Sequence, residues 1–148
     1  MEYRFAEISD IPLLAQLNEQ LIQDTGHPSR LSARELEPFI RGWLAVGYRA
    51  VLFEDDGEVV AYALYRPDET YRPDEESVYL RQFLVRRGSR GRGMGREAFR
   101  LLQERIWPPG CRVTADVLCT NQPAYDFWKR IGFRDYAIML ERDPGHRP

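Results

Sequence analysis

A run of arginines and glycines in the middle of the chain is the feature best suited to bind a ligand. Residues 79–85 are largely apolar and β-forming, and glycines follow at alternate positions 91, 93 and 95. Because glycine has no Cβ, successive backbone N–H groups can converge on an anion, and the start of a helix adds partial positive charge. The pattern predicts a phosphate-binding loop, with a solvated tight turn as the alternative. The surrounding arginines favour the phosphate, and they occupy positions 86, 87, 90, 92 and 96.

The composition is typical of one domain with nearly balanced charge. The chain has 148 residues, of which 43% are hydrophobic and 12% aromatic, enough for a single core. We therefore expect one domain over residues 1–142 and a flexible tail over residues 143–148. The formal net charge of -2 favours neither nucleic acid nor an anionic membrane as a partner.

Targeting and metal-binding signals are missing from the sequence pattern. No apolar run approaches the length of a membrane span, and residues 1–5 lack the order of a secretory signal, so we expect a cytoplasmic protein. The cysteines are Cys111 and Cys119, and the histidines are His27 and His146. So few ligands, so widely spaced, predict neither a disulfide framework nor a metal site.

The elements that must position the loop follow from periodicity and capping signals. Ser32 and Glu35 have capping-box spacing, Gly57 marks a hairpin turn, and Asn121 can cap the last helix. Residues 66–76 indicate an acidic loop stiffened by prolines. The predicted strands cover residues 3–6, 49–54, 59–65, 78–85, 112–119 and 133–141, and the predicted helices follow Ser9 or Asp10, Ser32, the glycine loop and Asn121.

This order predicts a mixed α/β fold, with a mostly antiparallel sheet and helices on both of its faces. Along the chain the elements run strand, two helices, three strands, helix, strand, helix, strand. Because the connection through the glycine loop and its helix is short, the strands at 78–85 and 112–119 should lie parallel.

Two motifs give the chain a resemblance to the GCN5-related N-acetyltransferase (GNAT) family over essentially its full length. Residues 90–95, Arg-Gly-Arg-Gly-Met-Gly, match the family's Arg/Gln-x-x-Gly-x-Gly/Ala signature after an apolar strand. Residues 121–133 match Asn-x-x-Ala-x-x-Phe-Tyr-x-x-x-Gly-Phe, with Trp128 at the tyrosine position. Each motif alone is moderately specific, and their combination in this order indicates the family.

The resemblance implies a GNAT-type fold and direct transfer of an acetyl group from acetyl-CoA to a primary amine through a tetrahedral intermediate. In the family, amides of the glycine loop bind the pyrophosphate, and the pantetheine arm lies where two parallel strands splay apart, here those ending near Val85 and Cys119. No metal is required. The residues expected to bind acetyl-CoA are Phe83, Leu84, Val85, Arg90, Gly91, Arg92, Gly93, Met94, Gly95, Asn121 and Trp128.

The catalytic groups depart from the family pattern. An indole N–H has no useful acidity, so Trp128 cannot replace the tyrosine as an acid, and it either stacks on the cofactor arm or packs in the core. Tyr125, one helical turn earlier, is the hypothetical catalytic substitute, with packing at the surface as its alternative. Residues 79–85 hold no carboxylate where the family often has its base. The remaining candidates for the base are Glu75, Glu76, Asp116, Asp24 and His27.

Two further departures concern the acceptor and the assembly. Arg81 is a charged residue within a strand, so it needs a partner or an opening to solvent, and in an acceptor cleft it would favour a substrate with a carboxylate. Many family members end with two strands, whereas only the strand at 133–141 fits here. The open edge predicts a homodimer.

Two other classes of function remain as alternatives. An acyl-CoA-binding or sensing module with little or no turnover would explain the missing tyrosine and strand carboxylate. Nucleic-acid binding by the arginines is disfavoured by the acidic balance and the lack of interleaved aromatics, and the glycine spacing does not fit a dinucleotide fold. We expect an active acetyltransferase whose partners are acetyl-CoA and an amine, with the acceptor left open by the sequence.

Overall fold

Within the part of the chain that the structure describes, five strands form one sheet in the order β1-β2-β3-β4-β5. The structure is a computed structural model that describes residues 1–68 and 72–146. The first three pairings are antiparallel, and β4 and β5 are parallel, as the sequence predicts. The strands are β1 (Glu2–Phe5), β2 (Arg49–Asp55), β3 (Glu58–Pro67), β4 (Ser77–Val85) and β5 (Arg112–Ala115).

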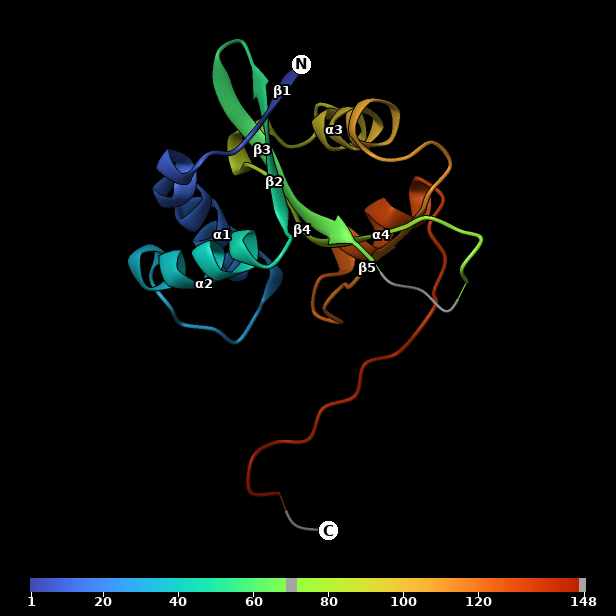
Figure 1. Cartoon of the computed structure of the whole chain (residues 1–148). Helices are drawn as coiled ribbons and strands as arrows, with labels where there is room; N and C mark the ends of the chain where they lie inside the picture. The colour runs from blue at the N-terminus through green and yellow to red at the C-terminus, as the bar shows by residue number, and fades with distance from the viewer. Residues whose placement is uncertain (69–71, 147–148) are drawn as a thin grey trace.

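The α-helices of the described residues lie on the two faces of this sheet, α1 and α2 on one side and α3 and α4 on the other (Figure 1). Helix α3 continues into a π-helical turn over Leu102–Ile106, and short 3-10 turns occupy Ile8–Asp10 and Arg87–Ser89. The helices are α1 (Ile11–Thr25), α2 (Ala33–Ala45), α3 (Met94–Leu101) and α4 (Gln122–Arg130). The prediction of a mixed α/β fold with helices on both faces is confirmed.

Local signals account for several of these boundaries. The Ser32 hydroxyl accepts a hydrogen bond from the Glu35 N–H at 3.2 Å, and the Glu35 carboxylate accepts one from the Ser32 N–H at 3.1 Å, which completes the capping box. The hairpin between β2 and β3 turns at Asp56 and Gly57, with φ of 53° and 81°. At the start of α4, the Asn121 side chain accepts a hydrogen bond from the Ala124 N–H at 3.3 Å.

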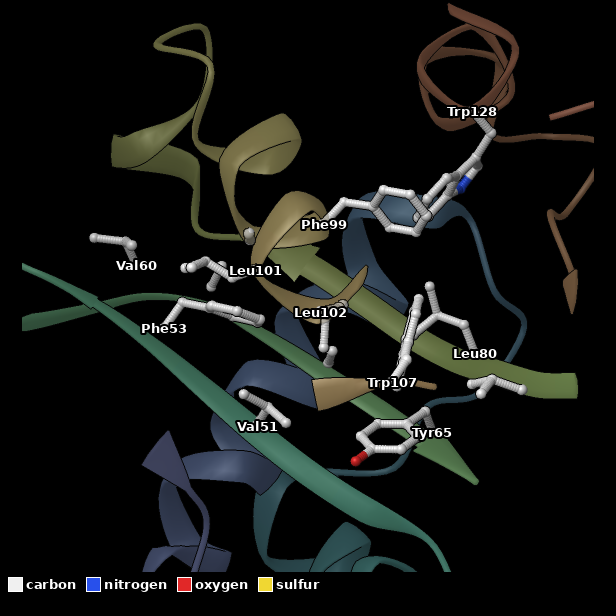
Figure 2. Close-up of a cluster of buried hydrophobic side chains, with 14 residues drawn as sticks. Val51, Phe53, Val60, Tyr65, Leu80, Phe99, Leu101, Leu102, Trp107 and Trp128 are labelled. Carbon is white, nitrogen blue, oxygen red and sulfur yellow. The ribbon is translucent and has the colours of Figure 1, made fainter. Parts of the chain in front are cut away.

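Two separate hydrophobic cores fill the two faces. The core between the sheet and α3 and α4 is rich in aromatic rings, among them Phe99, Trp107 and Trp128 (Figure 2). The core under α1 and α2 is mainly aliphatic, with Leu14, Leu36 and Ile40 among its members. Because the β-strand alternates its side chains between faces, β4 contributes to both cores.

The predicted strand at residues 133–141 is not formed, and β5 ends at Ala115 rather than Cys119. A strand needs a neighbour for its N–H and C=O groups, and the chain after α4 runs away from the sheet instead (Figure 1). Asp135 contacts α4 at the start of this segment, because its carboxylate accepts a hydrogen bond from Tyr125 at 2.8 Å and lies 3.4 Å from the Lys129 ammonium. The following apolar side chains are left exposed, from 70% at Tyr136 to 88% at Ile138.

Two predicted segments extend beyond the described residues. Positions 69–71 of the acidic loop and positions 147–148 of the tail lie outside them. Within the described part of the tail, the His146 N–H donates to the Asp143 carbonyl at 3.2 Å. Among the described residues, no helix is long and apolar enough to cross a membrane.

Candidate functional site

The centre of the site is an irregularity in β4. Leu64 of β3 pairs with Gln82, but the next residue, Tyr65, pairs with Leu80, so Arg81 has no partner on β3. Pairing of β4 with β5 ends at the same place, with Leu80 opposite Ala115. A β-bulge bends its strand and ends regular pairing, and such bulges are frequent beside active sites. The bulge therefore opens the sheet between the second half of β4 and the chain that follows β5.

The opened edge of β4 includes Phe83, Leu84 and Val85, which pair with β3 on their other side. In the described structure no strand covers the β5 side of these residues, and their backbone is available for a ligand there. The Val85 carbonyl is an exception, because it already accepts a hydrogen bond from Arg90 Nε at 2.8 Å. The expected parallel pairing of β4 and β5 is present, and it ends at Leu80 and Ala115, before the expected positions near Val85 and Cys119.

The glycine loop beyond β4 has the backbone that an anion site requires. Gly91 and Gly93 have φ of 77° and 73°, a left-handed conformation that costs other residues about 1–2 kcal/mol. A Cβ built on either residue meets no atom within 4 Å, so the loop surface there is open. The Glu97 N–H makes the first helical hydrogen bond, to the Gly93 carbonyl at 3.1 Å. The amides of residues 94–96 thus have no acceptor within α3 and fit a bound phosphate.

Gly95 is required for a different reason, namely the close packing of the loop. A Cβ at this position would lie 3.3 Å from the Phe127 ring of α4 and 3.4 Å from Val85 of β4. The residue therefore lets the start of α3 approach both elements. Met94, beside it, packs at the edge of the aromatic core.

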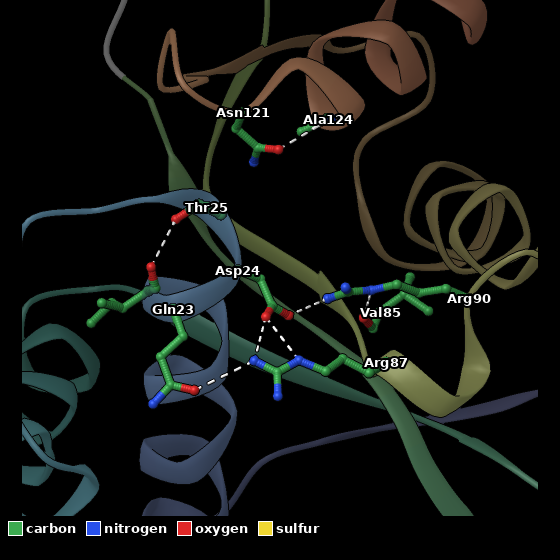
Figure 3. A network of polar contacts seen from close by, with 9 residues as sticks. Gln23, Asp24, Thr25, Val85, Arg87, Arg90, Asn121 and Ala124 are labelled. Atoms are coloured by element: carbon green, nitrogen blue, oxygen red, sulfur yellow. Dashed lines mark hydrogen bonds and ion pairs between the residues drawn. The ribbon is translucent and has the colours of Figure 1, made fainter.

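The loop arginines are largely occupied within the protein, contrary to a freely solvated cluster (Figure 3). Arg87 and Arg90 both pair with the carboxylate of Asp24 at the end of α1, at 2.5 Å and 2.6 Å. Burial works to raise the pKa of Asp24, but the hydrogen bonds from the two arginines outweigh it and hold this pKa below its usual range. Arg92 donates weakly to the Gly88 carbonyl at 3.4 Å.

The end of α1 also contacts the chain after β5, which closes the site on a third side. The Thr120 hydroxyl donates to the Thr25 carbonyl at 2.9 Å, and a Cβ on Gly26 would lie 3.0 Å from the same hydroxyl. Gly26 ends α1 with a φ of 74°. The α1 end, the glycine loop and Asn121 therefore surround the opening between β4 and β5.

Trp128, expected at the cofactor, lies in the aromatic core with only 7% of its surface exposed. Its ring contacts Phe83, Phe99, Phe127 and Phe133, with centroids 4.9 to 5.5 Å apart. These contacts agree with the alternative in which Trp128 packs in the core, and its contact with a cofactor stays a prediction.

Tyr125 lies on the exposed side of α4. Its hydroxyl donates to the Asp135 carboxylate, at 2.8 Å to one oxygen. This hydrogen bond raises the pKa of Tyr125, so the phenol is a neutral donor at physiological pH.

The candidate bases differ in what already binds them. Asp24 is held by two arginines, and Glu75 accepts hydrogen bonds from Arg112, which lower the pKa of that carboxyl. His27 Nδ1 accepts a hydrogen bond from the Ser29 N–H at 3.0 Å. Asp116 differs, because its partner is the neutral hydroxyl of Tyr79 at 2.5 Å.

The Asp116–Tyr79 contact lies where the sheet opens. Asp116 directly follows the last residue of β5. Tyr79 directly precedes Leu80, which is the last residue of β4 that pairs with β5. Burial, followed by the hydrogen bond to Asp116, raises the pKa of Tyr79 and keeps it protonated. Sequence reasoning named Asp116 but gave no signal for this pair, because the residues are 37 positions apart.

Metal ligands do not gather in the described part of the chain. No group of three or more His, Cys, Asp or Glu side chains there has the geometry to hold an ion.

Comparison with known families and structures is consistent with this geometry. A model of the acetyltransferase (GNAT) family matches residues 15–133. No curated protein matches the chain. A possible acetyltransferase from Clostridium difficile is similar in structure, with a TM-score of 0.76, 16% identity and coverage of 98% of each chain.

Two ligand complexes share the fold at similarly low identity. A predicted acetyltransferase from Clostridium acetobutylicum, solved with acetyl-CoA, has a TM-score of 0.70 and 22% identity, with 96% of this chain and 95% of the other covered. An aminoglycoside N-acetyltransferase in complex with CoA has a TM-score of 0.72 and 19% identity, with 97% and 94% covered.

Proposed function

The chain belongs to the GNAT acetyltransferase family, and from this premise we propose that it transfers an acetyl group from acetyl-CoA to a primary amine. The observation that carries the proposal is the coincidence of the β4 bulge, the end of β4–β5 pairing and the glycine loop in one opening. Acetyl-CoA has a pyrophosphate and a long, thin pantetheine arm. The free backbone amides of the glycine loop fit the pyrophosphate, and the unpaired edge of β4 before the loop fits the arm.

The donor side of this proposal uses the residues at the opening. Amides of the loop from Arg90 to Gly95 would hold the pyrophosphate, and the backbone of Phe83 to Val85 would pair with the pantetheine arm. Asn121 and Trp128 are assigned to the same cofactor from the family motif at residues 121–133. In the folded protein Asn121 also caps α4, and Trp128 also packs in the aromatic core.

The acceptor side rests on Asp116. We assign it the role of general base, because it lies at the opening and, unlike Asp24 and Glu75, is bound by a neutral group. The attacking amine forms a bond to the acetyl carbonyl carbon, the thioester C–S bond breaks, and the amine proton passes to Asp116 directly or through water. Tyr125 is proposed as the donor that protonates the leaving thiolate.

Thiol release from acetyl-CoA, measured across a panel of amines, tests the proposal. We expect turnover with at least one amine class, and a fall of about 100-fold in kcat for Asp116→Asn and for Tyr125→Phe. Tyr3→Phe, at an exposed tyrosine of β1, is the control and should keep full activity. Full turnover by Tyr125→Phe would remove that residue from the mechanism.

A binding or sensing module for acyl-CoA is the second candidate function. The absence of a carboxylate in the opened half of β4 favours it. Stabilisation of the protein by acetyl-CoA without thiol release for any amine would support this function and contradict turnover.

The assembly and the compartment are proposed on separate grounds. We propose a homodimer that covers the exposed apolar side chains between Tyr136 and Leu140, because a patch of this kind is costly in water. Light scattering on the full chain tests it, and a monomer at all concentrations would contradict it. A single domain over residues 1–142 and a cytoplasmic location remain proposals from the sequence.

A further inference from the structure

Arg81, the residue at the β4 bulge, is held by aromatic rings rather than by a carboxylate. The centre of its guanidinium lies 4.6 Å from the ring centroid of Trp43 and 5.6 Å from that of Tyr48. Its Nη1 also reaches the Tyr48 hydroxyl, at a long 3.4 Å. Stacking of this kind fixes a guanidinium without neutralising its charge.

Arg66 on β3 is held in the same way and shares one of these rings. Its guanidinium lies 5.4 Å from the Tyr48 centroid and 5.5 Å from the Tyr79 centroid. Two cations thus lie over the ring of Tyr48, on the α1 and α2 side of the sheet. Both guanidinium centres lie within 5.6 Å of one ring centroid, so an anion that reaches both would be stabilised by both charges.

The two arginines have unused hydrogen-bonding capacity. Neither forms an ion pair with any residue in 1–68 or 72–146, and the buried Nε of Arg66 has no acceptor there. A buried donor without a partner costs about 1–3 kcal/mol, which a ligand can recover. Other arginines of the chain do pair with carboxylates, namely Arg4, Arg72, Arg87, Arg90, Arg100 and Arg112.

This cationic pair lies next to the proposed base. Tyr79 contacts Arg66 with its ring and Asp116 with its hydroxyl, so one tyrosine separates the cations from the carboxylate. An acceptor that uses both would carry a negative group a few bonds from its amine. Arg81 adds to this arrangement, because it is the unpaired residue at the start of the opening.

We propose that Arg66 and Arg81 bind the carboxylate of an amino-acid-like acceptor, whose amine faces Asp116. The inference rests on the proposed acetyl transfer, and it names the acceptor class for that site. A carboxylate matches the planar guanidinium and carries a single charge, whereas a doubly charged phosphate would lie close to Asp116.

A series of ω-amino acids, in which the distance between the amine and the carboxylate increases, tests the proposal. Glycine, β-alanine, 4-aminobutyrate and 5-aminopentanoate are compared with their carboxamides, at saturating acetyl-CoA, by thiol release. We expect the acids to exceed the amides in kcat/KM by about 10-fold or more at one preferred length. Equal use of acid and amide at every length, or a preference for O-phosphoethanolamine over the acids, would overturn the proposal.

Arginine variants assign the effect to these side chains. Arg81→Met and Arg66→Met should each raise KM for the acid by about 10-fold and leave KM for the amide and the affinity for acetyl-CoA unchanged. Arg49→Met is the matched control, because Arg49 also stacks on a ring, that of Phe5 at 5.5 Å, but outside the cluster. Equal effects of Arg81→Met on acid and amide would contradict a carboxylate site.

A binding measurement separates this proposal from acetyl transfer. Calorimetry with the preferred ω-amino acid is carried out on the wild type and on Arg81→Met. Binding that requires Arg81, with no thiol release, would retain the carboxylate site and overturn the transfer reaction. Thiol release with no preference for acids would retain the reaction and overturn the site.

Discussion

The two faces of the sheet are built on different principles. Under α3 and α4, the rings of Phe99, Trp107 and Trp128 pack edge to face, with centroids of contacting pairs 5.5 to 5.7 Å apart. Under α1 and α2, the aliphatic core contains a buried polar chain, in which Tyr62 donates to Gln82 at 2.8 Å and Gln82 donates to Asn18 at 3.1 Å. One face is apolar and aromatic, and the other carries polar groups into the interior.

We infer that the aromatic face mainly stabilises the fold and that the polar face mainly serves the reaction. Aromatic packing depends on burial and shape, so it fixes α3 and α4 and thereby the glycine loop. The polar groups of the other face come from α1, β3 and β4, and Gln82 of β4 directly follows the unpaired Arg81. Polar groups in an interior are costly unless they are paired, so we expect them to contribute specificity more than stability.

Trp128→Ala should give the largest effect, because it removes the ring that joins α4 to the aromatic face. We expect a loss of about 3–5 kcal/mol in the free energy of unfolding, measured by urea denaturation. Trp128→Phe keeps most of the packing and is the control, with a much smaller loss. Near-normal stability of Trp128→Ala with lost acetyl-CoA binding would instead make the indole a cofactor contact.

Tyr62→Phe tests the polar face and should have a smaller effect. Burial raises the pKa of Tyr62, so its hydroxyl is a donor throughout the accessible pH range. Its removal leaves the Gln82 oxygen without this donor, at a cost of about 1–2 kcal/mol in unfolding free energy. Tyr3→Phe, at the surface on β1, should cost nothing measurable. A neutral Tyr62→Phe variant would show that the two faces differ less than their chemistry indicates.

Asp24→Asn tests the ion pairs that join α1 to Arg87 and Arg90 of the loop after β4. It should give the smallest loss in the free energy of unfolding, about 1 kcal/mol at neutral pH, because the two arginines are partly exposed. Burial raises the pKa of Asp24, but the hydrogen bonds from Arg87 and Arg90 hold it below its usual range in the folded protein. The contribution of Asp24 to stability is therefore fully present above its unfolded-state pKa and is lost as the pH falls through the lower folded-state pKa.

The measurement is urea denaturation of the wild type and Asp24→Asn between pH 7 and pH 2. The difference between them should shrink as the solution becomes acidic below about pH 4. Asp126→Asn is the matched control, because Asp126 accepts only from the Gln122 amide. A difference that grows toward low pH would contradict the assigned ion pairs.

Local sequence signals predicted most of the fold. The Ser32–Glu35 capping box, the turn at Gly57 and the cap at Asn121 depend on residues within a few positions of each other, and all three are present. The predicted strand at 133–141 failed because β-forming residues alone do not supply a partner strand. β5 ends early for a different reason, because its pairing with β4 stops at Leu80, next to the bulge at Arg81.

The candidate site also has one part that local sequence predicts and another that depends on contacts between distant residues. By itself the sequence determined the glycine loop and its place between β4 and α3, because positive φ and close packing restrict those positions to glycine. Only the tertiary structure decided that Asp24 holds Arg87 and Arg90, which lie 63 and 66 residues away. It also decided that Arg81 is the unpaired residue of a bulge, since register depends on the neighbouring strand. Contacts between distant residues leave no local pattern in the sequence. The loop for the acetyl donor could therefore be predicted from the sequence, whereas the arrangement of the acceptor side could not.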